Sequence, residues 1–253
     1  MRLLPDERLD AVNDVIKLIQ KKKGFCYGTD AVLLASYIKP SRGTAVELGA
    51  GSGIVSFLCE AHKKAGKIYS VELNDSAYDM LIRSAELNSS SIIPQKRDVR
   101  DLVSSDFGGE CATVFSNPPY MKSDSGFLNG DEVKRGARHE MAGDIKDFCA
   151  AAGRLLSTGG AFYCVYRPDR LTELFCAMRD SLLEPKRITF VHPFADKRSN
   201  LVLVEAKKDA SPGLFVTKPL VTMEKDADGK PVFTEEYNEI CEKCGFDERY
   251  LRI

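Results

Sequence analysis

Short apolar runs alternate with segments of helical periodicity over most of the chain. Apolar runs bounded by turn residues are typical of buried strands, whereas apolar residues three and four positions apart are typical of amphipathic helices. We expect helices at 54–64, 75–88 and 144–156, with Asn74 or Asp75 as the N-cap of the second. This alternation predicts an α/β fold with a mostly parallel, doubly wound sheet and helices on both faces. The sheet is expected to contain seven strands, at residues 44–50, 68–73, 95–99, 111–117, 160–167, 187–194 and 200–207.

The last two expected strands are joined only by the segment ADKRS. That connection is too short for a helical crossover, so these strands are expected to form an antiparallel hairpin. We expect a single domain, with a core at 44–208, a segment at 1–43 before it and an extension at 209–253 packed on it. Outside the core, the patterns predict a short strand at 15–20, a helix at 29–38, a short strand near 214–222 and a helix near 234–244.

Composition limits the classes of protein that the chain can belong to. Its 253 residues are 43% hydrophobic and 29% charged, with a net charge of −1, which indicates a soluble globular protein with a large core. Near-zero net charge neither requires nor excludes a nucleic-acid partner. The sequence shows no run of transmembrane length and no apolar signal core near its N-terminus, so we expect a cytoplasmic protein without a membrane partner. Cys241 and Cys244 form a lone C-x-x-C without a second pair or spaced histidines, so we expect no metal.

The segment VELGAGSG ends the first core strand and opens a helix. Gly49, Gly51 and Gly53 allow a tight turn and a close approach of the backbone to a ligand. The spacing differs from the dinucleotide fingerprint, and a glycine turn can also be a plain strand-to-helix connection. Glu72 ends the next strand, where a carboxylate beside the loop can accept both hydroxyls of a ribose. Glu47, inside the first strand, would need a ligand ammonium or backbone N–H groups to satisfy it.

A further carboxylate, Asp98, follows the third expected strand. In this architecture that position meets an adenine ring, and a side-chain oxygen there can accept the exocyclic amine. Asp101 is a competing candidate. Leu73 and Val99 follow Glu72 and Asp98 directly, and we include them in the expected cofactor site.

The segment SNPPYMK follows the fourth expected strand, on the same edge as the glycine loop. Asn117 offers a side-chain oxygen, and the Pro118–Pro119 pair holds a backbone carbonyl rigidly. Two acceptors can hold both hydrogens of a planar amine and aim its nitrogen, and no strong base is needed before attack. Tyr120 adds a ring for stacking, worth about 1–3 kcal/mol per base. The alternative is a plain Pro-Pro turn.

Together, NPPY and VELGAGSG resemble the Rossmann-like class I methyltransferases that act on adenine N6 or glutamine N5. The N-terminal segment, GARHE and LEPKRITFVHP resemble more narrowly the bacterial family that methylates N6 of adenine 37 in valine tRNA. The resemblance implies S-adenosyl-L-methionine as cofactor, with Asn117 also near it. It further implies that the segment before the first core strand closes over the cofactor, through Tyr27, Gly28, Thr29 and Asp30. The alternative for Thr29 or Asp30 is a helix N-cap.

The expected RNA partner is the anticodon arm of tRNA, and the protein is expected to be a monomer or weak dimer. Basic residues in the loops at the active-site edge could position its phosphates, although solvated loop charge is the alternative. These residues are Lys122, Lys134, Arg135, Arg138, Arg167, Arg170, Lys197 and Arg198.

Other functions compete with tRNA methylation. Protein-glutamine methyltransferases of release factors share the clamp but resemble one another in a sizeable helical domain ahead of the glycine strand. About 43 residues precede that strand here. Adenine methyltransferases of DNA normally add a target-recognition region, and no long insertion is visible. A non-enzymatic binding module would not need the clamp together with a complete cofactor site.

Overall fold

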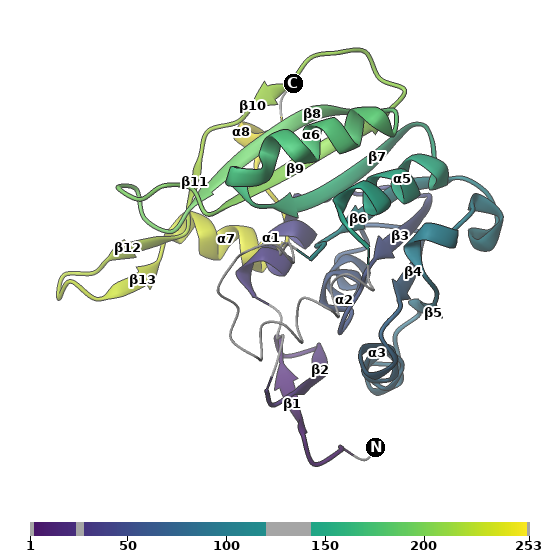
Figure 1. Cartoon of the computed structure of the whole chain (residues 1–253). Helices are drawn as coiled ribbons and strands as arrows, with labels where there is room; N and C mark the ends of the chain where they lie inside the picture. Colours follow the sequence, from purple (N-terminus) through teal and green to yellow (C-terminus); the bar gives the residue numbers. More distant parts are fainter. Residues whose placement is uncertain (1–2, 24–27, 120–142, 252–253) are drawn as a thin grey trace, which may run out of the picture.

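The computed structural model of the chain describes residues 3–23, 28–119 and 143–251. Its centre is a nine-stranded sheet with the order β10-β8-β9-β7-β6-β3-β4-β5, in which β11 pairs with β8 (Figure 1). The seven main strands are β3 (Thr44–Leu48), β4 (Lys67–Glu72), β5 (Ile93–Lys96), β6 (Cys111–Ser116), β7 (Leu156–Tyr166), β8 (Leu183–His192) and β9 (Leu201–Lys208).

All the main strands except β9 run parallel, and β9 lies antiparallel between β7 and β8. The expected seven-stranded, mostly parallel sheet with an antiparallel terminal hairpin is therefore confirmed. The hairpin forms because the β8–β9 connection has no room for a helix.

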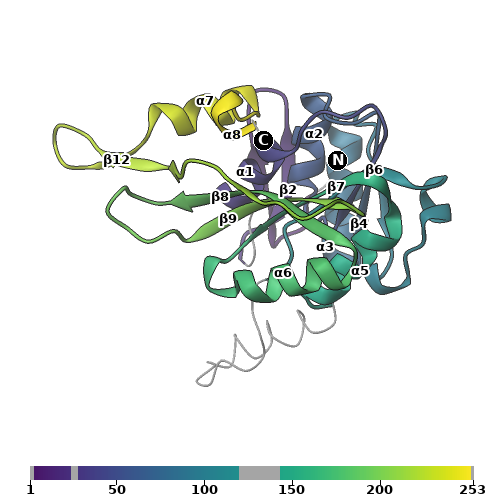
Figure 2. The ribbon, with the colours of Figure 1, turned by 90° about the horizontal axis from the view of Figure 1, so that it is seen from above.

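Helices cover both faces of the sheet (Figure 2). One face packs on α1 (Thr29–Tyr37), α2 (Ile54–Ala61), α3 (Asp75–Leu87) and α7 (Glu235–Lys243), and the other on α5 (Ile145–Leu155) and α6 (Leu171–Asp180). The central strands are buried on both sides, as parallel strands between two helical layers must be.

The remaining elements are short. They are the hairpin β1 (Glu7–Ala11) and β2 (Lys17–Lys21), the pieces β10 (Phe215–Val216) and β11 (Leu220–Val221), the hairpin β12 (Met223–Lys225) and β13 (Pro231–Phe233), the helix α8 (Glu248–Leu251), and the 3₁₀ turns η1 (Val99–Asp101), η2 (Ser104–Phe107) and η3 (Pro168–Arg170). The β12–β13 hairpin projects from the body of the protein (Figure 1).

The fifth strand begins at Leu156, four residues before its expected start, and two other expected elements differ for local reasons. The third strand ends at Lys96, and Asp98 caps a 3₁₀ turn, with its side chain accepting from the backbone N–H of Arg100. The tail strand expected near 214–222 is two separate pieces on either side of Pro219, which has no N–H to donate to a ladder. The Asp98 cap therefore accounts for the end of the third strand and Pro219 for the division of the tail strand.

A buried ion pair joins the C-terminal segment to the core. The fully buried Arg187 guanidinium donates from Nε to Glu205 at 2.8 Å. Its two other nitrogens donate to the backbone carbonyls of Tyr250 at 2.9 Å and Tyr37 at 3.1 Å. One side chain therefore links β8, β9, α1 and α8.

The described part of the chain contains no helix with the length and hydropathy needed to span a membrane. Cys241 lies in α7 and Cys244 is its C-cap. Within the described ranges, no three His, Cys, Asp or Glu side chains are grouped so that they could hold a metal ion.

Candidate active site

The candidate site lies where β3, β4 and β6 end. Leu48, the last residue of β3, pairs with Val71 of β4 on one side and with Ser116 of β6 on the other. The glycine loop, Glu72 and Asn117 therefore leave the sheet at the same edge, which is where ligands of open α/β sheets bind.

The glycine loop has a backbone that favours glycine. Gly49, Gly51 and Gly53 have φ angles of +70°, +56° and +82°. A Cβ on Gly53 would lie 2.3 Å from Leu81 Cδ1, so any other residue at this position would force the Leu81 side chain to shift. A Cβ on Gly51 would meet no atom within 4 Å, which leaves space beside the loop that a ligand could fill.

Glu72 lies beside this loop, as the sequence predicted. Its Oε2 accepts from the backbone N–H of Gly51 at 2.8 Å, and its Oε1 accepts from that of Asn74 at 2.7 Å. The carboxylate is therefore held in one orientation, next to the space above Gly51.

Glu47 is buried behind the loop. Its Oε2 accepts from the backbone N–H of Ser56 at 3.1 Å and from the Ser56 hydroxyl. The Ser70 hydroxyl donates to the Ser56 oxygen at 2.7 Å. Burial raises the pKa of Glu47 to about 8, and the hydrogen bonds from Ser56 oppose that rise. Of the two alternatives for satisfying Glu47, the structure favours protein donors from α2.

The residues expected to lie near the adenine ring of the cofactor differ in their environments. Asp98 is held by the Arg100 guanidinium, which keeps the pKa of this carboxyl below its usual value. Asp101 is exposed, Leu73 is half-buried, and the Val99 side chain is part of the core under α5. A cofactor contact at position 99 would therefore involve the backbone.

Asn117 contacts the first turn of α1. Its Nδ2 donates to Asp30 Oδ2 at 2.9 Å, across 87 residues of sequence. Pro118 is buried and Pro119 is half-buried. The predicted Tyr120 and Tyr27 lie outside the described residues.

The start of α1 differs from the capping alternative. The N-cap is Gly28, without a side-chain cap, so the alternative that Thr29 or Asp30 is the N-cap is wrong. The exposed Thr29 opens the helix, and Asp30 Oδ1 accepts from the backbone N–H of Ala31 at 2.9 Å. Asp30 Oδ2 thus remains oriented toward Asn117.

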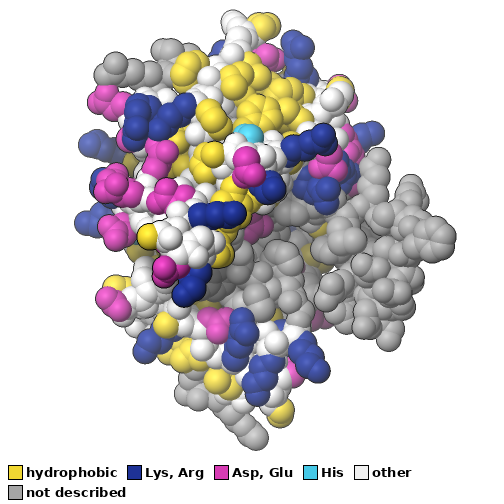
Figure 3. Space-filling model, turned by 90° about the vertical axis from the view of Figure 1, so that its left-hand side faces the viewer, with side chains coloured by type: hydrophobic (Ala, Val, Ile, Leu, Met, Phe, Trp, Pro, Cys, Tyr) yellow, Lys and Arg dark blue, Asp and Glu magenta, His cyan; other side chains and the backbone are white. Residues whose placement is uncertain are grey.

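Three predicted RNA-binding residues, Arg167, Lys197 and Arg198, are exposed. Arg167 pairs with Asp169 at 2.9 Å and Lys197 with Asp196 at 3.5 Å. Acidic and basic side chains alternate on the face that carries the β12–β13 hairpin, around a hydrophobic area (Figure 3). Arg170 pairs with Glu173. The predicted Lys122, Lys134, Arg135 and Arg138 lie outside the described residues.

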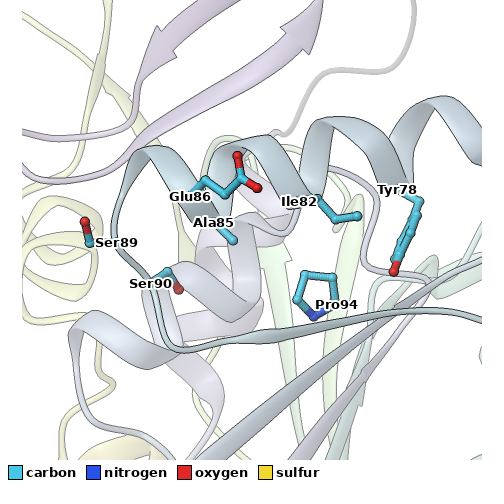
Figure 4. Close-up of a pocket in the computed structure, with 7 residues that line it drawn as sticks. All are labelled: Tyr78, Ile82, Ala85, Glu86, Ser89, Ser90 and Pro94. Carbon is cyan, nitrogen blue, oxygen red and sulfur yellow. The ribbon is translucent and has the colours of Figure 1, made fainter. Parts of the chain in front are cut away.

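A surface depression lies elsewhere, between α3 and β5 (Figure 4). Its lining includes Tyr78, Ile82 and Pro94, but neither Glu72 nor any glycine of the loop. It is therefore separate from the candidate site.

The sequence did not predict a role for Ser56 or Ser70, or the contact between Asp30 and Asn117. The sequence predicted that Glu47 needs hydrogen-bond donors, but not that Ser56, nine positions later, supplies them. No local pattern links Asp30 to Asn117.

Comparisons with known proteins agree with this geometry. Residues 22–182 match the family model described as methyltransferase small domain. The tRNA1(Val) (adenine(37)-N6)-methyltransferase of Aeromonas hydrophila is 28% identical over 181 residues, which covers 70% of this chain and 74% of that protein. The enzyme of the same name from Flavobacterium johnsoniae is 27% identical over 187 residues, covering 68% and 74%.

Solved structures share the fold. A crystal structure from Agrobacterium tumefaciens, titled as a predicted O-methyltransferase, superposes with a TM-score of 0.68 at 23% identity, covering 86% of this chain and 98% of that one. The tRNA m1G37 methyltransferase of M. jannaschii gives a TM-score of 0.55 at 16% identity, covering 81% and 58%. At these identities the likeness shows the class I methyltransferase fold alone. With the family match over residues 22–182, the chain belongs to the methyltransferase small domain family.

Proposed function

We propose that this chain is an S-adenosyl-L-methionine-dependent methyltransferase of the N6 amine of adenine in tRNA, with adenine 37 of valine tRNA as its target. The proposal rests mainly on one observation: the glycine loop, Glu72 and Asn117 lie together at one edge of the sheet. The names of the relatives from Aeromonas and Flavobacterium support the choice of tRNA and of nucleotide.

The residues at the edge fit the cofactor. The open space at Gly51 admits a ligand against the backbone, and the Glu72 carboxylate beside it suits two ribose hydroxyls. Asp98 or Asp101 would accept the adenine amine. When bound, S-adenosyl-L-methionine supplies a methyl group on a positively charged sulfur. Glu47 acts from behind the loop, where it fixes the start of α2 through Ser56.

The target amine would be held by the clamp after β6. The Asn117 oxygen and the Pro118 carbonyl can accept its two hydrogens, which turns the nitrogen lone pair out of conjugation with the ring and aims it at the methyl group. Methylation makes this amine acidic, so its proton can pass to water afterwards and the clamp needs no strong base.

The RNA would approach this edge from the loops after β7 and β8, where Arg167, Lys197 and Arg198 are exposed. Because acidic side chains accompany these cations, we assign them phosphate contacts that position the anticodon arm and not a broad electrostatic attraction. We also propose that the enzyme works in the cytoplasm, where a tRNA substrate would be found, and that it is a monomer or weak dimer.

The second candidate is methylation of a glutamine N5 in a protein. A candidate protein N5-glutamine methyltransferase of Methanocaldococcus jannaschii is 30% identical, but over only 90 residues, or 36% of this chain. The matches to the tRNA enzymes extend over about twice that length, and they favour the RNA substrate.

The test is transfer of labelled methyl groups to unmodified total tRNA, followed by mapping of the modified nucleoside. We expect N6-methyladenosine at position 37 of valine tRNA, and Asn117→Ala should remove it while cofactor binding persists. A release factor offered in the same assay should stay unlabelled. Labelling of the release factor but not of tRNA would replace this proposal by the second candidate.

A further inference from the structure

Asp30 and Asn117 are joined by a hydrogen bond whose direction is fixed by chemistry. An ionised carboxylate can only accept, so the Asn117 amide must turn its NH₂ group toward Asp30. The C=O and C–N bonds of an amide diverge from each other, so Oδ1 then points away from the Asp30 carboxylate. The bond therefore selects one of two orientations that have nearly the same shape.

That selection matters because the two orientations have opposite chemistry. With Oδ1 presented, the amide accepts a hydrogen from the target amine. With the amide reversed, an NH₂ group would face the N–H groups of the target, and the clamp would repel its substrate. We propose that Asp30 is a positioning residue that holds the Asn117 amide in its accepting orientation, an inference that rests on the proposed function.

The Asp30 carboxylate is itself held in place. Its Oδ1 accepts from the backbone N–H of Ala31, which directs Oδ2 toward Asn117. A Cβ on Gly28 would lie 2.8 Å from Asp30 Oδ1, so the glycine at position 28 leaves the room that this carboxylate occupies. The carboxylate also lies in the first turn of α1, where the helix dipole favours negative charge.

The bond also changes the acceptor strength of the amide. A charge-assisted hydrogen bond to the NH₂ group draws electron density toward Oδ1. The more negative oxygen stabilises the positive charge that develops on the target nitrogen as it is methylated. Asp30 therefore acts through Asn117 without touching the substrate.

The sequence predicted that Asp30 contacts the cofactor directly, and mutation distinguishes that role from positioning Asn117. If Asp30 binds the cofactor, removing its carboxylate should raise the cofactor Kd. If Asp30 positions Asn117, removing the carboxylate should lower kcat at saturating cofactor. The variants are Asp30→Asn, Asp30→Ala and Gly28→Ala, the last of which keeps the carboxylate but pushes it out of place. Glu235→Gln is the matched control, because it removes an exposed first-turn carboxylate from another nine-residue helix.

We expect Asp30→Asn and Asp30→Ala to lower kcat on tRNA roughly 10- to 100-fold, with cofactor Kd by calorimetry within about twofold of wild type. Gly28→Ala should fall between wild type and Asp30→Ala, and Glu235→Gln should have no effect. A weakened cofactor Kd with normal kcat in the Asp30 variants would overturn the inference.

A readout without substrate separates this inference from the proposed function. The side-chain NH₂ resonances of Asn117, assigned by their absence in Asn117→Ala, should shift in Asp30→Asn and not in Glu235→Gln. If those resonances respond as expected but no tRNA is methylated by the wild type, only the proposed function fails. If tRNA is methylated and the resonances are indifferent to Asp30, only the inference fails.

Discussion

The Glu72 carboxylate accepts from the backbone N–H of Gly51 at 2.8 Å, and so connects the end of β4 to the turn that follows β3. These residues are 21 positions apart in sequence, but the parallel pairing of β3 and β4 brings them to one edge of the sheet. The contact orients the carboxylate before any ligand arrives, which lowers the entropy lost on binding.

The first prediction tests Glu72. Glu72→Ala removes the proposed acceptor of the ribose hydroxyls, and we expect the Kd for S-adenosylmethionine or S-adenosylhomocysteine to rise at least tenfold, or about 1.4 kcal/mol. Glu72→Gln keeps one oxygen acceptor, so its Kd should rise less than that of Glu72→Ala. The measurement is titration calorimetry. Unchanged affinity in the Ala variant would remove Glu72 from the site.

The second prediction concerns pH. Burial raises the pKa of Glu47 to about 8, against 4.5 for an unperturbed glutamate, so the folded state binds a proton that the unfolded state releases. The free energy of unfolding therefore falls as pH rises from about 5 to 8, by up to about 1.4 kcal/mol per pH unit from this group. Glu47→Gln should remove that slope. Urea titrations across this range check it, and equal slopes in both proteins would contradict a buried neutral Glu47.

The third prediction concerns the buried ion pair. Arg187→Met leaves the buried Glu205 paired with Lys39 at 3.1 Å but without the Arg187 cation, and takes donors from two backbone carbonyls. We expect the free energy of unfolding to fall by about 3–5 kcal/mol in this variant. Arg179→Ala breaks the ion pair between the exposed Arg179 and the half-buried Glu184, and should change stability by about 0.5 kcal/mol or less. Comparable losses in the two variants would show that Arg187 does not dock the C-terminal segment.

The core of the fold could be predicted from sequence because its strands and helices carry strong local signals. VELGAGSG marks a strand, a turn and a helix together, and the short ADKRS connection forces an antiparallel pair. The helix α6 and the hairpin β12–β13 were not predicted. The exposed residues of β13 show that this hairpin lacks the alternation that reveals a half-buried strand.

The site was predictable only where it follows a strand end. Glu72 is the last residue of β4 and Asn117 directly follows β6, so the topology alone places them at one edge. The bond between Asp30 and Asn117 depends on how α1 packs over that edge, and the bond between Asp98 and Arg100 on a local turn. Neither packing nor turn geometry leaves a periodic pattern in the sequence.

The last prediction concerns the RNA surface. Lys197 and Arg198 lie in the β8–β9 loop, just beyond the carboxyl end of β8, and both are exposed. If each contacts one phosphate, the logarithm of tRNA affinity should fall linearly with the logarithm of salt concentration, and Lys197→Ala with Arg198→Ala should reduce that slope by about one per contact. Cofactor affinity should not change.

The matched control is the pair Lys186→Ala and Arg179→Ala, because these cations lie near the start of β8, at the opposite edge of the sheet. This control removes two positive charges, as Lys197→Ala with Arg198→Ala does, but no proposed phosphate contact. The dependence of its tRNA affinity on salt should therefore equal that of the wild type. The measurement is tRNA binding at several salt concentrations. If both double variants shift the slope equally, the effect is one of overall charge, and the RNA does not bind over the β8–β9 loop.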